Sequence, residues 1–145
     1  MKNEKLFRIL LIEDNLGDIR LTREAFKETS LPCSLQAVTD GDEALKYLFG
    51  LQHTPDAQLP HLILLDLNLP KRDGREVLAA IKQDPLLKKI PVIVLTTSNA
   101  ENDINMAYSL HANSYLVKPI DFDKFLDMVH LIEQYWLKTI TLPNM

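Results

Sequence analysis

The sequence has little of several features that mark particular classes of protein. Its 145 residues include a single cysteine, Cys33, so an internal disulfide is impossible, and this cysteine usage suits a reducing compartment. No apolar run approaches the roughly 18–20 residues of a membrane span. The first residues contain neither the apolar core nor the small-residue cleavage site of a secretory signal. We therefore expect a cytoplasmic protein without a membrane segment.

An excess of positive charge is also lacking. Lys and Arg number 16 against 20 Asp and Glu, which gives a net charge of −4. A binder of the nucleic-acid backbone usually carries a basic patch, so we expect no nucleic-acid partner. Hydrophobic residues make up 46% and charged residues 25%, as in ordinary globular proteins, which excludes a disordered chain or a coiled coil. The length fits a single domain.

What the sequence does contain is alternation between short apolar runs and stretches with helical periodicity. The apolar runs, which we interpret as strands, are residues 9–12, 34–38, 62–65, 92–95 and 114–117. Three of them are apolar at every position, which is typical of parallel strands buried on both faces. Five helices are expected between and after these runs: Leu16–Glu28, Asp40 to about Gly50, a helix that begins at Asp73, Asn99 to about His111, and about Asp121–Leu137. Asp40 with Glu43, and Asp73 with Glu76, have the spacing of capping boxes. The third helix has an apolar stripe of Val77, Leu78 and Ile81, and the last has one of Phe122, Phe125, Leu126, Val129, Ile132 and Trp136.

Strict alternation of strand and helix predicts an α/β fold with an open, doubly wound parallel sheet, because a closed eightfold barrel needs about 250 residues. Functional sites in such sheets lie beyond the carboxyl ends of the strands. The residues that follow the apolar runs are therefore the candidate site. They are Glu13 and Asp14, Asp66, Thr96 to Ser98, and Lys118 with Pro119.

Three carboxylates at one edge of a sheet repel one another, and a divalent cation removes the conflict. The ligands are hard oxygens with no Cys or His nearby, which favours Mg²⁺ over Zn²⁺. Glu13, Asp14 and Asp66 carry −3, whereas Mg²⁺ and Lys118 carry +3, so the site would accept an anionic phosphoryl group. Aspartate can serve as a nucleophile in phosphoryl transfer. Each residue alone has an ordinary explanation as a helix cap, a turn or a solvated charge; their convergence favours this function.

Four motifs at these strand ends resemble the receiver domain of two-component response regulators. The motifs are Leu11-Ile12-Glu13-Asp14-Asn15, Leu64-Leu65-Asp66-Leu67-Asn68-Leu69-Pro70, Pro91-Val92-Ile93-Val94-Leu95-Thr96 and Tyr115-Leu116-Val117-Lys118-Pro119. The resemblance covers about residues 7–138. It implies a flavodoxin-like (βα)5 fold with strand order 2-1-3-4-5. It also implies one receiver domain over residues 1–145, with residues 139–145 as a C-terminal tail.

The resemblance further implies the roles of individual residues. Asp66 is expected to accept the phosphoryl group from a sensor histidine kinase. Mg²⁺ is expected to bind Asp14 and Asp66, Glu13 directly or through water, and the main-chain carbonyl of Asn68. In many receivers an aspartate stands where this chain has Glu13. Such a protein catalyses only its own phosphorylation and dephosphorylation, so it is not an enzyme with a diffusible product.

The same resemblance assigns a switch. Thr96 and Lys118 are expected to hold the phosphoryl group, with Tyr115 turning inward as the Thr96 hydroxyl moves toward the phosphate. The Lys118–Pro119 peptide is expected to be cis, which costs little before proline. Too few residues follow the last helix for a DNA-binding unit, so we expect signals to leave through the receiver surface. The expected output face is the fourth helix, fifth strand and fifth helix, beside Thr96 and Tyr115.

Other segments resemble a narrower group, the small regulators paired with cyanobacterial phytochromes. They are residues 73–78, 95–98 and 136–143, together with a long loop at 50–60. This implies a histidine kinase of the phytochrome type as partner. Leu131 and Tyr135 lie off the core stripe of the last helix, and Ile140 and Leu142 alternate in the tail, so the tail either folds back on its domain or forms a homodimer contact.

Two other functions remain open at this point. One is a phosphorylation-independent interaction module on the same fold, since fold does not guarantee chemistry. The other is a flavodoxin-like cofactor binder, although Glu13 and Asp14 would repel a flavin phosphate. The four histidines show no ligand spacing, Cys33 is expected to be a small buried residue, and Lys71, Arg72 and Arg75 are expected to be solvated charges or contacts for an acidic partner.

Overall fold

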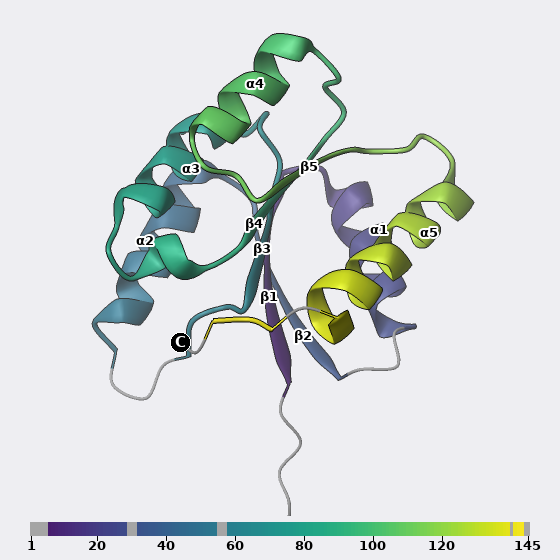
Figure 1. Cartoon of the computed structure of the whole chain (residues 1–145), viewed down its shortest axis with the longest axis horizontal. Coiled ribbons are helices and arrows are strands. Elements are labelled where there is room, and N and C mark those ends of the chain that lie inside the picture. Colours follow the sequence, from purple (N-terminus) through teal and green to yellow (C-terminus); the bar gives the residue numbers. More distant parts are fainter. Residues whose placement is uncertain (1–5, 29–31, 55–57, 140, 144–145) are drawn as a thin grey trace, which may run out of the picture.

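A computed structural model describes residues 6–28, 32–54, 58–139 and 141–143. Five parallel strands form one sheet in the order β2-β1-β3-β4-β5, which confirms the predicted topology. The strands are β1 (Phe7–Ile12), β2 (Cys33–Val38), β3 (Leu62–Leu65), β4 (Val92–Thr96) and β5 (Ser114–Val117). Helices cover both faces of the sheet (Figure 1), with α1 (Leu16–Lys27) and α5 (Phe122–Ile132) on one side and α2 (Gly41–Gln52), α3 (Gly74–Gln83) and α4 (Glu101–Ser109) on the other.

The central strands are buried because both of their faces are covered. Alternate residues of β1, such as Ile9 and Leu11, pack with α1 and α5, whereas Leu10 and Ile12 pack with α2, α3 and α4. Every residue of β3 and β4 is buried in the same way. The edge strand β2 instead alternates between half-buried and exposed positions before its last residue, Val38, which is buried. The fully apolar runs in the sequence therefore mark the middle of the sheet, as expected for a parallel sheet between helices.

Side-chain caps begin most of the helices. Asn15, Asp40, Asp73 and Asp121 each accept a hydrogen bond from a main-chain N–H in the first turn of the helix that follows. The α4 prediction was wrong at its start: the N-cap is Ala100, and no side chain caps it. Ser98 lies two residues before Ala100, and its Oγ accepts from the Ala100 N–H instead. A serine turn therefore replaces the expected Asn99 cap.

Three further details differ from the sequence prediction. Helix α2 continues through Gly50 to Gln52. The last helix is α-helical only to Ile132 and continues as a π-helical segment, η2 (Glu133–Thr139). Phe122, which we assigned to the core stripe, is 46% exposed, because it occupies the first position of α5, before the helix packs on the sheet. A short 3-10 turn, η1 (Leu87–Lys89), joins α3 to β4.

Gly74 allows α3 to begin directly against the end of β3. A Cβ at this position would lie 2.3 Å from the carbonyl oxygen of Asp66, closer than any side chain tolerates. The Gly74 N–H donates to the Leu67 carbonyl at 2.9 Å, which holds the loop in place. The backbone that carries Asp66 is therefore fixed on its α3 side.

None of the helices in the described ranges is both long and apolar enough to span a bilayer.

Candidate functional site

Three carboxylates meet at the carboxyl edge of the sheet. The N–H of Glu13 donates to Val38 and that of Asp66 to Ile12, both at 3.0 Å, so hydrogen bonding between strands continues one residue past β1 and β3. Oxygens of Glu13, Asp14 and Asp66 lie within 4.8 Å of one another. Glu13 and Asp66 are buried, and Asp14 is exposed to solvent. Three hard oxygen ligands that are open on one side suit Mg²⁺.

One ammonium group lies against these acids. Lys118 follows β5, and its N–H donates to the Thr96 carbonyl at 2.7 Å, which places the side chain beside the cluster. Its Nζ contacts Glu13 Oε1, and it bonds Asp66 Oδ2 at 3.1 Å and Asp18 Oδ2 at 2.8 Å. Three carboxylates thus occupy the three donors of the ammonium group.

Sequence reasoning missed Asp18. The available signal was its place in the first turn of the helix that directly follows Glu13 and Asp14. The start of α1 lies next to the carboxyl edge, so its first turn presents Asp18 to Lys118.

The pKa values reflect an excess of acid. Burial raises the pKa of Glu13 to about 7, and Asp66 adds to the rise while Lys118 opposes it. Burial alone would raise the pKa of Asp66, but hydrogen bonds from Asn68 and Lys118 lower it below its ordinary value. For Lys118, burial is outweighed by Asp18, Glu13 and Asp66, which raise the pKa. At neutral pH Asp66 is therefore ionised beside an ammonium group.

A buried hydroxyl group completes this edge. Thr96 ends β4 and is fully buried, and its Oγ1 has no hydrogen-bond partner among the described residues. Such a group costs free energy unless a ligand supplies an acceptor. Asn68 donates its N–H to Asp66 Oδ1 at 3.1 Å and is itself exposed.

Tyr115 is engaged away from Thr96. Its hydroxyl donates to the Ser98 carbonyl at 2.9 Å. Ser98 Oγ in turn donates to Asp103 at 2.6 Å, and Arg75 binds the other oxygen of Asp103 at 2.6 Å and also Asp73. These hydrogen bonds join β5, the loop after β4, α4 and the start of α3. The sequence pattern indicated Tyr115 but not its partner, because a main-chain acceptor leaves no trace in residue types.

The profile of the response regulator receiver domain matches residues 9–130. The chain belongs to that family. It is 49% identical to Response regulator Rcp1 of Synechocystis sp., over 93% of this chain and 92% of that protein. The receiver has a TM-score of 0.91 and 49% identity to the crystal structure of the phosphorylated cyanobacterial phytochrome response regulator RcpA, covering 97% of this chain and 100% of that one. The Mn²⁺-bound form of Rcp1 has a TM-score of 0.87 at 48% identity, covering 94% and 99%.

One expectation for the receiver is wrong in this structure: the Lys118–Pro119 peptide is trans, like the other described peptide bonds. The two isomers before proline differ by only about 0.5–1 kcal/mol in an unconstrained chain, so residue types do not decide between them.

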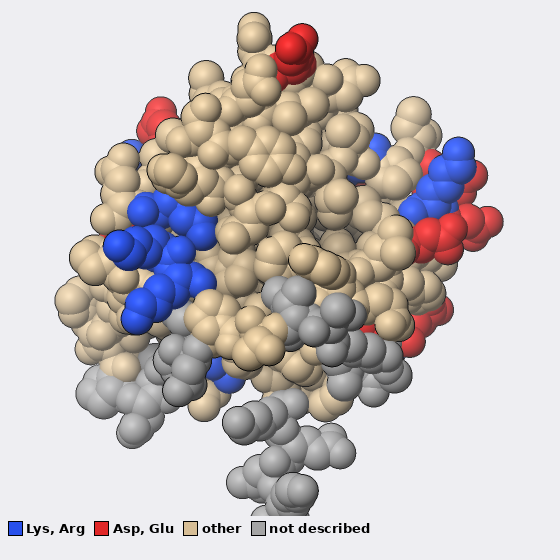
Figure 2. Space-filling model, in the orientation of Figure 1, with Lys and Arg blue, Asp and Glu red and all other residues tan. Residues whose placement is uncertain are grey.

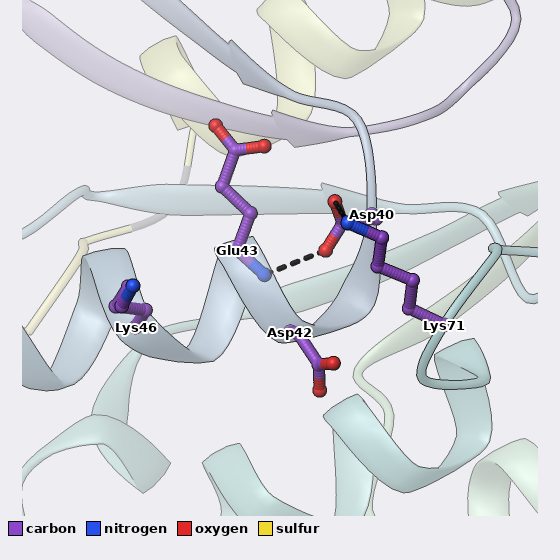
Figure 3. Close-up of a pocket in the computed structure, with 5 residues that line it drawn as sticks. All are labelled: Asp40, Asp42, Glu43, Lys46 and Lys71. Carbon is purple, nitrogen blue, oxygen red and sulfur yellow. Dashed lines mark hydrogen bonds and ion pairs between the residues drawn. The ribbon is translucent and has the colours of Figure 1, made fainter.

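The receiver has a hollow of about 270 Å³ at the start of α2 (Figure 3). Asp40 accepts from the Glu43 N–H at 2.7 Å and lies 3.7 Å from Lys71 Nζ, whereas Asp42 binds Arg72 at 2.8 Å. The side chains of Asp42 and Glu43 point in different directions in Figure 3, so the acids do not converge on one point. Lys71 and Arg72 thus pair with acids of this chain, as Arg75 does.

A groove of about 290 Å³ leads from solvent to Lys118. Its lining includes Asp18, Thr97, Ile120 and Phe122. Ile120 is fully exposed. The groove makes the cluster accessible to an incoming group.

Proposed function

We propose that this receiver accepts a phosphoryl group on Asp66 in a Mg²⁺-dependent reaction. The observation that carries the proposal is the imbalance of charge at the carboxyl edge. Glu13, Asp18 and Asp66 share the Lys118 ammonium group, and Asp14 lies beside Glu13 and Asp66. The Thr96 hydroxyl, at the end of β4, has no hydrogen-bond partner among the described residues. A divalent cation and phosphoryl oxygens would satisfy both features.

In this proposal Asp66 is the nucleophile, because its lowered pKa keeps it ionised and its Oδ2 already lies beside Lys118. Its oxygen attacks phosphorus, the P–N bond of a phosphohistidine breaks, and the electron pair and a proton remain on the imidazole. Lys118 and the Thr96 hydroxyl bind phosphoryl oxygens. Glu13, Asp14, Asp66 and the Asn68 carbonyl would hold Mg²⁺, which would supply positive charge against the negative charge of the transferring group.

The donor we propose is a sensor histidine kinase of the phytochrome type. The support is similarity: the relatives described above include Rcp1 and a regulator whose crystal structure is described as that of a cyanobacterial phytochrome response regulator. We further propose that residues 1–145 act as one receiver unit in the cytoplasm, with a core over about 7–138 and a tail at 139–145.

The output surface we propose consists of α4, β5 and α5, beside the Thr96–Tyr115 switch. Large apolar side chains are exposed on these elements and on η2, namely Met106, Tyr108, Val117, Leu131 and Tyr135. Figure 2 shows few charged side chains in the middle of this view, where Figure 1 places β5 between α4 and α5. We propose that this surface forms a twofold homodimer. In the tail Leu142 is half-buried, and Ile140 lies outside the described residues.

Intact mass after incubation with acetyl phosphate tests the central proposal. Wild type with Mg²⁺ should gain one phosphoryl group, whereas Asp66→Asn and a chelated wild-type sample should gain none. A phosphoryl group on Asp66→Asn would contradict the assignment. Absence of both Mg²⁺ binding and a phosphoryl adduct in wild type would favour the alternative, a phosphorylation-independent interaction module.

A further inference from the structure

The three carboxylates on Lys118 are not equivalent. Glu13 and Asp66 also belong to the cluster that could hold a metal ion, whereas Asp18 does not. A cation would draw the oxygens of Glu13 and Asp66 toward itself, and a phosphoryl group would remove the negative charge of the Asp66 carboxylate. Asp18 is therefore the one carboxylate on Lys118 whose charge remains available throughout the reaction.

Asp18 is held firmly by its own helix. Its N–H donates to Asn15 Oδ1 at 3.0 Å, which caps α1, and its carbonyl accepts from Thr22 Oγ1 at 2.7 Å. Its side chain is 27% exposed on the wall of the groove that leads to Lys118. Because a capped helix fixes the backbone of Asp18, the carboxylate acts as a rigid anchor for a long and flexible lysine.

We propose that Asp18 is a positioning residue that holds the Lys118 ammonium beside Asp66 while the metal and the phosphoryl group occupy the other two acids. This inference rests on the proposed function, and it assigns to α1 a part in positioning the lysine that the reaction uses. Asp18 touches neither the metal nor the phosphoryl group in this account. Its loss displaces the lysine from the transferring oxygens and leaves the metal ligands in place.

The test compares Asp18→Ala and Asp18→Asn with wild type and with Asp123→Ala. Asp123 is an exposed first-turn acid of α5, and Lys118 makes no ion pair with it, so this control matches the loss of a helix-terminal charge. The measurements are the Kd for Mg²⁺ and the rate of phosphorylation against acetyl phosphate concentration at saturating Mg²⁺. Urea unfolding confirms that each variant is folded at the assay temperature.

In Asp18→Ala we expect the maximal phosphorylation rate to fall about tenfold, with the half-saturating donor concentration and the Mg²⁺ Kd each within about threefold of wild type. Asp18→Asn should retain most of the rate, because its amide oxygen still accepts from the ammonium group. Asp123→Ala should behave as wild type. A structural role alone would not produce this separation of maximal rate from affinity.

Three results would overturn the proposal while leaving the proposed function intact. They are an unchanged rate in Asp18→Ala, an equal loss of rate in Asp18→Asn, and a Mg²⁺ Kd in Asp18→Ala that rises more than about threefold above that of wild type. A wild-type protein that gains no phosphoryl group would instead reject the proposed function, and this inference with it.

Discussion

Two clusters of charged residues at the same edge of the sheet differ in how well their acidic and basic groups are matched. Arg75 pairs with Asp103, whose other oxygen accepts from Ser98, and these bonds raise the pKa of Arg75 and lower that of Asp103. Around Lys118 the acids outnumber the cation, and burial raises the pKa of Glu13. A satisfied ion pair therefore favours its charged forms, whereas a site in which acids outnumber the cation disfavours the charged form of one acid.

Replacing Lys118 should have the largest effect on the acid-rich cluster. In Lys118→Met the acids lose the one cation that pairs with them among the described residues, so without metal the free energy of unfolding should fall by about 3 kcal/mol or more. Mg²⁺ should bind at least about tenfold more tightly, because a repelling charge is gone. Phosphoryl transfer should slow on the order of a thousandfold. Urea unfolding in chelator and calorimetric titration measure the first two effects; weaker Mg²⁺ binding would contradict the account.

Glu13 should make the free energy of unfolding of the metal-free protein depend on pH. Its pKa is about 7 in the folded chain against an ordinary value of 4.5, so between these pH values the folded protein keeps a proton that the unfolded chain has released. The free energy of unfolding without metal should therefore decrease as pH rises through this window, by up to about 3 kcal/mol.

Unfolding of wild type and Glu13→Gln in urea, from pH 4.5 to 7.5, isolates this effect as the difference between the two proteins. Saturating Mg²⁺ should weaken the pH dependence, because the metal favours the ionised carboxylate. A difference that does not vary with pH would show that burial does not govern the pKa of Glu13.

Thr96→Val removes a polar atom that lacks a partner among the described residues. The unphosphorylated protein should gain about 1 kcal/mol in its free energy of unfolding. Phosphoryl transfer should slow on the order of a hundredfold, because a donor to the phosphoryl oxygens is lost. A loss of stability in thermal and urea unfolding would mean that the hydroxyl group is already satisfied.

The balanced cluster should give the smallest effect. Arg75→Gln breaks a partly exposed ion pair, so the free energy of unfolding should fall. The size of this decrease should be smaller than the size of the increase expected for Thr96→Val. The Mg²⁺ Kd should not change, because the candidate metal site consists of Glu13, Asp14 and Asp66 beside Lys118 and does not include Arg75. Unfolding and metal titration on one preparation check both statements, and an altered Mg²⁺ Kd would show that the clusters are linked.

The sequence patterns predicted the strands better than the helix starts. Residues 62–65 match β3 at both ends, because this short buried strand is wholly apolar and is followed by the polar Asp66. Residues 114–117 match β5 at both ends as well, although that strand is only half-buried and ends at an exposed residue. The start of α4 was missed because Ser98 and Asn99 are both good cap formers, and only the backbone geometry decides which one bonds.

At the candidate site, residue types indicated the acids, the lysine and the hydroxyl group. They did not indicate Asp18, whose role depends on how α1 sits against β5, or the Ser98 carbonyl, which is a main-chain group. The residue types likewise did not determine the isomer of the Lys118–Pro119 peptide, which is trans. Side-chain chemistry was thus predictable, whereas contacts made by tertiary packing or by the backbone were not.

The most direct measurement is to trap the phosphorylated side chain by borohydride reduction, which converts an aspartyl phosphate to homoserine, and to locate it by tandem mass spectrometry. After incubation with acetyl phosphate and Mg²⁺, the account predicts homoserine at Asp66 and at no other acid of the cluster. Homoserine at Asp14 or Asp18, or conversion of Asp66 that persists in chelator, would contradict a Mg²⁺-dependent phosphoacceptor at the end of β3.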